Sequence, residues 1–544
     1  MVEELKKIIQ GEVATDEKTL VEYSADASVF QVRPKVVVFP KDATDISALV
    51  KFVSSQKAHD PSLSLTARSA GTDMSGGPLN ESIIVGFTKY MNRILGFEGD
   101  RVRVQPGMYY RDFATEAEAK DLLLPSYPAS KDLAAMGGLI NNNSGGELTL
   151  RWGKTNRYVE ELKVVLADGN EYTLSKLTLN ELNAKRRQED FEGDIYRRVH
   201  DVLEKNYDVI QSARPNVTKN SAGYALWDVY NRDTFDLTQL FVGAQGTLGF
   251  VTEAKLRLIT PPKHRRLAVL FLKDWKRVPE LVNALLPLDP ESMEVFDDAT
   301  LKLALRFFPE IAKRTEGHNM FSLARQFIPE FFIGVRMLGL PKLVMLVEIA
   351  ENDEAEADRK LEELHRETKK LKTIHRLVRT EEDAEKYWII RRESFALLRK
   401  HVGDKRTAPF VDDFIVRPEF LPEVLPQILA ILKRYKIGAT LAGHAGDGNF
   451  HIIPLMDLSK KSEQEKIPVV SGLVYDIVLK YEGSTTAEHN DGIIRTPYVE
   501  KMYGEEVYNI FKEIKDIFDP QNIFNPGKKV GGTMEYAVRH INHE

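Results

Sequence analysis

Cysteine is absent from the 544-residue chain. The protein therefore cannot form disulfides, hold an iron–sulfur cluster through its own cysteines or use a cysteine nucleophile. Long apolar runs are also missing, since none approaches the roughly 18 residues that a membrane span requires. The first ten residues, MVEELKKIIQ, lack the apolar segment of a signal peptide. These absences predict an intracellular, cytoplasmic protein.

An excess of one charge is likewise absent, because 75 basic residues stand against 81 acidic ones and the net charge is −6. Such a balance gives no reason to expect nucleic acid or another polyanion as a partner. Hydrophobic residues make up 43% of the chain and charged residues 29%, which is ordinary for globular domains. We therefore expect several domain-sized units with a substantial core.

Two histidines flank a predicted turn in the stretch GHAGDGNFH, residues 443–451. Gly446 to Asn449 are turn-forming residues, so we expect a hairpin in which His444 lies opposite His451. Cross-strand neighbours have Cβ atoms about 5 Å apart, which lets both imidazoles reach one metal ion. Glu488 is the candidate third ligand, and two histidines with one carboxylate leave coordination positions open for a substrate. Two histidines beside a turn are also common on ordinary polar surfaces, and both interpretations stay open here.

The first glycine-rich stretch, TARSAGTDMSGG, spans Thr66 to Gly77. It follows a predicted strand, Val36 to Phe39, and a predicted helix with Thr44 as its N-cap. Its small residues let several backbone N–H groups face one concavity, which suits a pyrophosphate, although a plain loop has the same composition. The stretch matches neither a Rossmann nor a P-loop motif.

A second glycine-rich region runs from Leu124 to Gly169. Prolines open it, and it then combines closely spaced glycines with a polar run from Asn141 to Ser144, a pattern that favours close approach of the backbone to a ligand. It ends in a predicted strand and the hairpin signal Asp168-Gly169. The stretch Leu240 to Thr260 predicts a further pair of strands punctuated by glycine.

After Pro261 and Pro262 the pattern changes, and we predict a domain boundary there. Strand-like and helix-like segments alternate over the next hundred residues, which indicates an α+β unit of the ferredoxin-like kind. A helix from about Glu382 to Lys400 carries Arg391 on an aromatic face, where it either binds an anion or extends past the core to solvent. An amphipathic helix with Val507 and Phe518 on its apolar face precedes the C-terminus.

These motifs together carry a family resemblance. TARSAGTDMSGG, MGGLINNNSGG and VGAQGTLGFVTE resemble the FAD domain of the vanillyl-alcohol-oxidase type. GHAGDGNFH, AEHNDG and the ending IFNPGKK resemble the branch that holds D-lactate, glycolate and D-2-hydroxyglutarate dehydrogenases. The resemblance implies an α+β protein with a two-lobed FAD-binding domain over residues 1–260. It further implies a ferredoxin-like substrate (cap) domain over 261–485 and a C-terminal helical segment, 486–544, that returns to the FAD domain.

The resemblance also implies roles for individual residues. His444, His451 and Glu488 would hold a divalent metal, most often zinc. His489 would act as acid/base and Arg391 would bind the substrate carboxylate, in the FAD-dependent oxidation of a small D-2-hydroxy acid such as D-lactate. The implied FAD contacts are Arg68, Ser69, Ala70, Gly71, Thr72, Asp73, Ser75, Pro128, Ser130, Gly137, Gly138, Asn143, Gly145, Gly153 and Val251.

Three features depart from the family pattern. Asn490 and Asp491 follow the implied base where relatives carry glycine and a small apolar residue, which leaves the substrate preference open. Ser69 and Ala70 replace two glycines of the first loop. No histidine falls within residues 68–77, and there is no cysteine, so we expect FAD to be bound non-covalently. A non-redox transferase like alkylglycerone-phosphate synthase and a catalytically silent flavoprotein subunit are the alternatives.

Electrons from reduced FAD need an acceptor outside this chain, since a chain without cysteine carries no iron–sulfur cluster of the usual kind. The acceptor would be a quinone, an electron-transfer flavoprotein, a separate iron–sulfur subunit or oxygen. The apolar segment Phe321 to Pro341, which carries Arg325 and Arg336, is a candidate for peripheral contact with the inner face of a membrane. Burial in the core of the second domain is the alternative.

Overall fold

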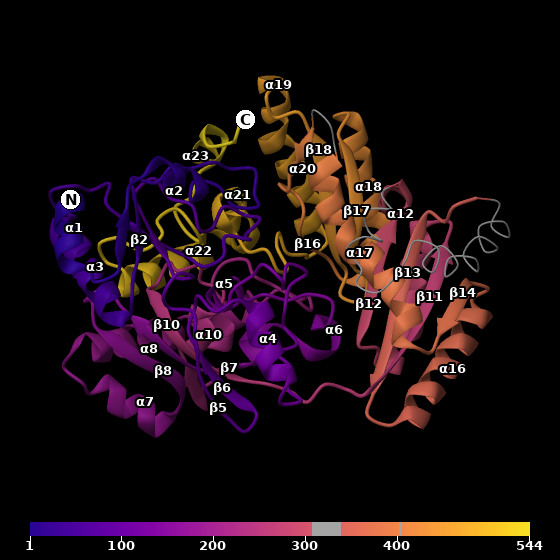
Figure 1. Cartoon of the computed structure of the whole chain (residues 1–544), viewed down its shortest axis with the longest axis horizontal. Coiled ribbons are helices and arrows are strands. Elements are labelled where there is room, and N and C mark those ends of the chain that lie inside the picture. The colour runs from indigo at the N-terminus through magenta and orange to yellow at the C-terminus, as the bar shows by residue number, and fades with distance from the viewer. Residues whose placement is uncertain (307–338, 402–404, 544) are drawn as a thin grey trace.

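The computed structural model describes residues 1–306, 339–401 and 405–543, which build three β-sheets (Figure 1). Two sheets and their helices form the lobe that contains the N-terminus, called the N-terminal lobe below. The third sheet builds the cap lobe on the opposite side (Figure 1). Residues 321–338 of the segment considered for membrane contact lie outside the described residues. Among the described helices, none is long and apolar enough to cross a membrane.

The first sheet contains both parallel and antiparallel pairs. Its order is β1–β2–β4–β3, with β2 and β3 each parallel to β4. Asp42, rather than the predicted Thr44, caps α3, because its carboxylate accepts the backbone N–H groups of Thr44 and Asp45. The elements are α1 (Val2–Ile8), β1 (Glu12–Ala14), α2 (Glu17–Glu22), β2 (Val36–Phe39), α3 (Ala43–Gln56), β3 (Leu65–Arg68) and β4 (Ile83–Gly86).

The second sheet is antiparallel and follows the order β5–β6–β10–β7–β8–β9. The predicted hairpin at Asp168-Gly169 joins β7 to β8, and Gly169 adopts a φ of +73° there. Its strands are β5 (Ile94–Glu98), β6 (Arg101–Val104), β7 (Val159–Val165), β8 (Glu171–Thr178), β9 (Thr234–Asp236) and β10 (Phe250–Arg257). Its helices are α4 (Tyr110–Glu118), α5 (Met136–Asn142), α6 (Thr149–Trp152), α7 (Leu179–Arg186), α8 (Phe191–Lys205), α9 (Tyr207–Ser212) and α10 (Thr238–Phe241).

The cap lobe is built on a large antiparallel sheet. Four strands follow the order β14–β11–β13–β12 with βαββαβ connectivity, into which α12 (Asp298–Arg306) is inserted between β12 and β13, and this is the predicted ferredoxin-like arrangement. The strands β17, β18 and β15 extend the sheet beyond β12, and β16 pairs with β18. The strands are β11 (His264–Leu272), β12 (Ser292–Asp297), β13 (Leu343–Glu351), β14 (Ile374–Val378), β15 (Arg406–Thr407), β16 (Phe414–Ile415), β17 (Gly438–His444) and β18 (Asn449–Met456).

Helices cover both faces of the cap sheet. Alternate residues of β11 enter different cores: Leu270 packs with residues of α11 and α16, and Val269 packs with Tyr387 and Trp388 of α17. Burial on both faces explains why β11 and β13 read as continuous apolar runs. The helices are α11 (Val278–Leu285), α12 (Asp298–Arg306), α16 (Glu354–Lys370), α17 (Glu381–His401), α18 (Leu421–Arg434), α19 (Lys461–Gln464) and α20 (Lys466–Lys480).

The end of the chain packs against the N-terminal lobe. The apolar face of α22 (Val499–Phe518) is buried beside α8, as the periodicity predicts, and Phe524 packs edge-on to Phe250 at 5.3 Å. Leu65 donates its N–H to the carbonyl of Ile523, which fixes the returning segment to β3. The division of the chain at residues 260 and 485 stays a prediction. The remaining helices are α21 (Gly492–Arg495) and α23 (Met534–Arg539).

The histidine hairpin forms, but with a different register from the predicted one. The turn is Ala445 to Gly448, so His444 pairs with Asn449 and His451 pairs with Ala442. Asn449 belongs to the strand rather than the turn because its amide donates to Asp413 Oδ1 and to the carbonyl of Phe414. The register shifts by two residues, which keeps both histidines on one face of the sheet as diagonal neighbours. Their ring centroids lie 5.2 Å apart.

The turn has a backbone constraint that can be tested by substitution. Gly448 adopts a φ of +76°, and a Cβ there would lie 1.9 Å from the carbonyl oxygen of Val416. We expect Gly448→Ala to destabilise the protein by about 1–3 kcal/mol, the usual cost of a strained backbone position. The measurement is thermal unfolding. Gly438→Ala on the same hairpin is the control, since nothing lies within 4 Å of its added Cβ, and an equal melting temperature for both variants would contradict the argument.

Candidate active site

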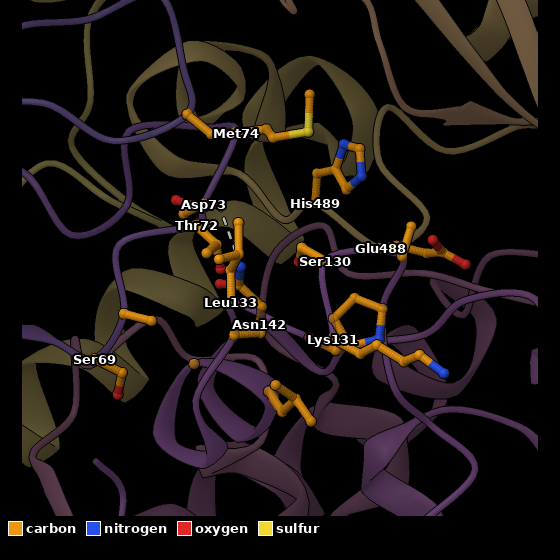
Figure 2. A pocket seen from close by; sticks show the side chains of 18 of the residues that line it. Ser69, Thr72, Asp73, Met74, Ser130, Lys131, Leu133, Asn142, Glu488 and His489 are labelled. Carbon is orange, nitrogen blue, oxygen red and sulfur yellow. Dashed lines mark hydrogen bonds between the residues drawn. The ribbon is translucent and has the colours of Figure 1, made fainter. Parts of the chain in front are cut away.

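A cavity of about 910 Å³ lies between the two lobes. Loops of the N-terminal lobe, within residues 67–78 and 127–147, form one wall, and β17, β18 and α17 of the cap lobe form the other together with Glu488 and His489. In Figure 2, Ser69 lies at one end of the pocket, and Glu488 and His489 lie toward the other. A cavity of this size, concave and mostly formed by fixed elements, is typical of a cofactor or substrate site.

Most of the residues predicted to contact a cofactor line this cavity. They belong to three separate segments, which the fold brings together on the wall of the N-terminal lobe. These residues are Ser69, Ala70, Gly71, Thr72, Asp73, Pro128, Ser130, Gly137, Gly138, Gly145 and Val251.

Arg68 and Ser75 do not line the cavity. The Arg68 guanidinium donates to the carbonyl of Ala25 and lies 4.9 Å from the centre of the Tyr23 ring. It therefore supports the first glycine-rich loop from the side that faces away from the cavity. Ser75 is fully buried and donates to the carboxylate of Asp73.

Asn143 and Gly153 also lie outside the lining. Asn143 ends α5 in the left-handed conformation, with a φ of +49°, and its Oδ1 accepts the N–H of Asn156. Gly153 ends α6 with a φ of +79°. Both residues shape the polypeptide around the cavity, and neither contributes to its wall.

The walls have the properties that a bound FAD requires. Gly138 opens onto free space, since the nearest atom to an added Cβ would be Ser69 Cβ at 3.9 Å. Leu133 lines the cavity while 62% exposed, so an apolar surface is available for a ring system. Asp26, at the same wall, has one buried carboxylate oxygen, Oδ2, without a hydrogen-bond partner among the described residues. Burial and the neighbouring Asp73 raise the pKa of Asp26 to about 7.

His444, His451 and Glu488 are brought together as predicted. The potential ligand atoms of this triad lie within 4.8 Å of one another, with Glu488 Oε2 3.4 Å from His444 Nε2 and 4.0 Å from His451 Nε2. This donor set fits a divalent ion such as zinc with at least one open position. A second group, Asp413 with His451 and His489, is equally close, but Asp413 already accepts hydrogen bonds at both oxygens.

Outer partners fix the orientation of both histidines. His444 Nδ1 lies 2.5 Å from Glu294 Oε1, and His451 Nδ1 lies 2.8 Å from the carbonyl oxygen of Asp412. Both contacts place the proton on Nδ1 and leave Nε2 facing Glu488, which is the arrangement that second partners impose on metal-binding histidines. Burial and the nearby His489 and His444 lower the pKa of His451 to about 4, so its ring is neutral.

His489 is held at the cavity wall by a carboxylate. Its Nδ1 lies 2.7 Å from Asp412 Oδ2, and its ring stacks on His451 with centroids 5.0 Å apart. The neutral ring would therefore accept a proton at Nε2. Burial opposes the charged ring, but Asp412 and Asp413 outweigh that effect and raise the pKa of His489 to about 9 in the metal-free protein.

Arg391 lines the cavity from α17. Its Nη2 lies 3.1 Å from Glu294 Oε2, the carboxylate that also binds His444. Glu294 therefore connects the candidate carboxylate-binding arginine to a candidate metal ligand.

Asn490 and Asp491, the two departures beside His489, do not line the cavity. Asn490 is buried and donates to the carbonyl of Gly243 at 2.9 Å. Asp491 is fully buried, forms an ion pair with Lys529 at 3.0 Å and accepts the N–H of Gly223. Their side chains anchor the loop to the N-terminal lobe.

Sequence reasoning missed four residues that surround the triad: Lys219, Glu294, Asp412 and Asp413. The adjacent pair Asp412-Asp413 and the lysine that opens KNSAGYALWDVY were visible in the sequence. No local spacing connects them to the site, because their hydrogen bonds with Glu488, His444, Asn449 and His489 span 36 to 269 residues.

Fold and cavity together define a flavoprotein of the vanillyl-alcohol-oxidase type. Family models agree: the FAD binding domain matches residues 34–175, and the C-terminal domain of FAD linked oxidases matches residues 261–529. The chain belongs to the FAD-linked oxidases, and FAD is its cofactor.

Among curated proteins, D-2-hydroxyglutarate dehydrogenase of Pantoea ananatis is 28% identical over 95% of this chain and 50% of the relative. Glycolate oxidase subunit GlcD of Bacillus subtilis is 28% identical over 93% of this chain and 91% of the relative. The chain therefore spans about half the length of the first relative and most of the second.

Solved structures show the same fold at low identity. A 4-ethylphenol oxidase from Gulosibacter chungangensis superposes with a TM-score of 0.69 at 16% identity, over 98% of this chain and 97% of the other. Alkyldihydroxyacetonephosphate synthase superposes with a TM-score of 0.65 at 14% identity, over 97% of this chain and 84% of the other.

The position of Gly138 gives a direct test of the cofactor site. We expect Gly138→Leu to fold normally but to purify without FAD, because the new side chain would occupy the cavity rather than the protein interior. The measurements are the ratio of flavin to protein absorbance and the melting temperature of the flavin-free protein. Gly438→Leu, at an exposed position with open space, is the control and should retain FAD. Full flavin content in Gly138→Leu would place the cofactor elsewhere.

Proposed function

We propose that this protein oxidises a small D-2-hydroxy acid, similar to D-lactate, to the 2-oxo acid. The segments within residues 67–78 and 127–147 would hold FAD, which would supply the two-electron chemistry, and the electrons would then leave for an acceptor outside the chain. The observation that carries the proposal is that one cavity is lined by the FAD loops, by His444, His451 and Glu488, by His489 and by Arg391. The names of the two curated relatives, a D-2-hydroxyglutarate dehydrogenase and a glycolate oxidase subunit, support the same class of substrate.

Arg391 would bind the substrate carboxylate. A guanidinium presents parallel N–H donors that match a carboxylate in bidentate geometry, and Glu294 holds this one in place at the cavity wall. A carboxylate held in this way also fixes the position of the neighbouring α-carbon. Its C–H bond is therefore oriented for the reaction when the substrate binds.

His444, His451 and Glu488 would hold a divalent ion beside the substrate hydroxyl. When bound, such an ion supplies a positive charge that lowers the pKa of the hydroxyl. The two histidines present Nε2 toward this position because Glu294 and Asp412 occupy their Nδ1 atoms.

His489 would remove the hydroxyl proton at Nε2. Asp412 accepts the hydrogen bond from Nδ1, which orients the ring and stabilises the charge it gains with the proton. When bound, FAD supplies the acceptor for the α-hydrogen and its two electrons.

The comparisons do not favour a non-redox transferase. The synthase shares the fold alone, at 14% identity, whereas the curated relatives at 28% identity carry the names of a dehydrogenase and an oxidase subunit. A catalytically silent flavoprotein subunit that only transfers electrons does not require an acid/base histidine, an arginine and three candidate metal ligands in one cavity.

The proposed reaction is tested by anaerobic mixing of the purified flavoprotein with a panel of D- and L-2-hydroxy acids. We expect loss of the oxidised-flavin absorbance within a single turnover for D-isomers. A panel that leaves the flavin oxidised throughout would refute the proposed reaction. External electron acceptors can then be ranked by the rate at which each restores the absorbance.

His489→Ala tests the proposed base. We expect the variant to keep FAD and to reduce it about 10²- to 10⁴-fold more slowly with substrate, the usual contribution of a positioned acid/base. Stopped-flow absorbance measures the rate. His59→Ala, which removes an exposed histidine just after α3, is the control for removing an imidazole. An unchanged rate in His489→Ala would remove this residue from the mechanism.

His444→Ala and Glu488→Ala test the proposed metal ligands. Because each removes one ligand of three, we expect both variants to lose metal and activity together while FAD stays bound. Elemental analysis of the wild type and the variants, each alongside its flavin content, is the measurement. Stoichiometric metal that survives both substitutions would show that the ion binds elsewhere.

A further inference from the structure

Lys219 is a buried cation directly behind the candidate metal site. Its side chain is wholly buried, and its Nζ lies 2.6 Å from Glu488 Oε1 and 3.0 Å from Asp447 Oδ2. Both carboxylates are themselves almost fully buried, with side chains 6% and 3% exposed. Taking a lysine into the interior is costly unless it is paired, so this position needs an explanation beyond chance packing.

The two oxygens of Glu488 face different partners. Oε2 points to the histidines, 3.4 Å from His444 Nε2, whereas Oε1 points to Lys219. Gly145 closes the same side, since a Cβ added there would lie 3.2 Å from Oε1. Only one carboxylate oxygen is therefore directed at the space between the two imidazoles.

We propose that Lys219 is a positioning residue that restricts Glu488 to binding the metal through a single oxygen. This inference rests on the proposed metal site. Zinc accepts few ligands, so a carboxylate that binds through both oxygens would occupy a position that the substrate hydroxyl needs. By holding Oε1, Lys219 keeps that position open.

The same ammonium group also joins the two segments that supply the ligands. Asp447 lies in the turn between β17 and β18, the strands that carry His444 and His451, and Glu488 lies in the loop before α21. Lys219 donates to both, so the distance between the hairpin and the loop is set before any ion binds. Second partners of this kind typically contribute about 10- to 100-fold to metal affinity.

A merely structural role, in which Lys219 only compensates buried negative charge, makes a different prediction. The double variant Lys219→Met, Asp447→Asn removes one cation and one anion, so the net charge of the site is unchanged. Glu488 is the one carboxylate that loses its partner, and the bound metal can compensate its charge. If charge balance is the whole role, metal binding in this variant will match the wild type. If Lys219 positions Glu488, the carboxylate will be free to bind through both oxygens.

The experiment compares the full-length zinc-loaded proteins by X-ray absorption at the zinc edge and by competition with a chelator. For the double variant we expect one additional oxygen ligand and an affinity about 10- to 100-fold lower. The control is Lys515→Met, Asp519→Asn, which removes another buried lysine–aspartate pair, on α22 and its end, that contacts none of the candidate ligands. We expect its zinc coordination and affinity to equal those of the wild type.

The outcomes separate this inference from the proposed function. Zinc coordination and affinity that are unchanged in the double variant overturn the role of Lys219 and leave the metal site intact. A wild type that binds no stoichiometric zinc, cobalt or manganese overturns the metal site and this inference together. If Lys219→Met, Asp447→Asn does not fold, the zinc affinity of the single variant Asp447→Asn is measured instead. This variant removes one of the two carboxylate partners of Lys219 and keeps the cation. An unchanged zinc affinity would then contradict the proposal.

Discussion

One carboxylate, that of Asp413, organises the site. Its Oδ2 accepts hydrogen bonds from the Thr486 hydroxyl and from the backbone N–H groups of Ala487, Glu488 and His489. Its Oδ1 accepts the amide of Asn449 at the start of β18. Burial opposes the negative charge, but His489, His451 and Arg495 outweigh it and lower the pKa of Asp413 below its usual range. The loop with Glu488 and His489 is thus fixed to the histidine hairpin by a group that contributes nothing to the cavity wall.

The two lobes contribute different chemistry to one space. The N-terminal lobe offers small residues and backbone groups, which suit an extended cofactor, and the cap lobe offers imidazoles from its sheet and guanidinium groups from α17, which suit a small anion. Buried charges are paired across the lobes, since Lys219 of the N-terminal lobe contacts Asp447 of the cap hairpin and also Glu488. Because breaking such a pair leaves an uncompensated charge in the interior, these contacts hold the lobes in a defined relation. The site therefore depends on lobe assembly as much as on the residues that line it.

Local patterns in the sequence were enough to predict the glycine-rich loops, the ferredoxin-like order of the cap and the amphipathic face of α22, because each depends on neighbouring residues. The hairpin register was wrong because the partner that draws Asn449 into the strand, Asp413, lies 36 residues away. Glu294 and Lys219 escaped detection for the same reason, with contacts across 150 and 269 residues. The family resemblance implies an FAD contact from Arg68, whereas its side chain turns back to Tyr23 and Ala25.

The central claim is that the metal ligands of the cap and the FAD loops act on one substrate. The most direct measurement is anaerobic stopped-flow absorbance of FAD-saturated protein with D-lactate or a longer D-2-hydroxy acid, comparing metal-loaded protein with protein depleted by a chelator. We expect rapid flavin reduction in the loaded protein, a large loss of rate on depletion and recovery when the metal is restored. Equal rates in the depleted and loaded proteins, at equal FAD content, would contradict it.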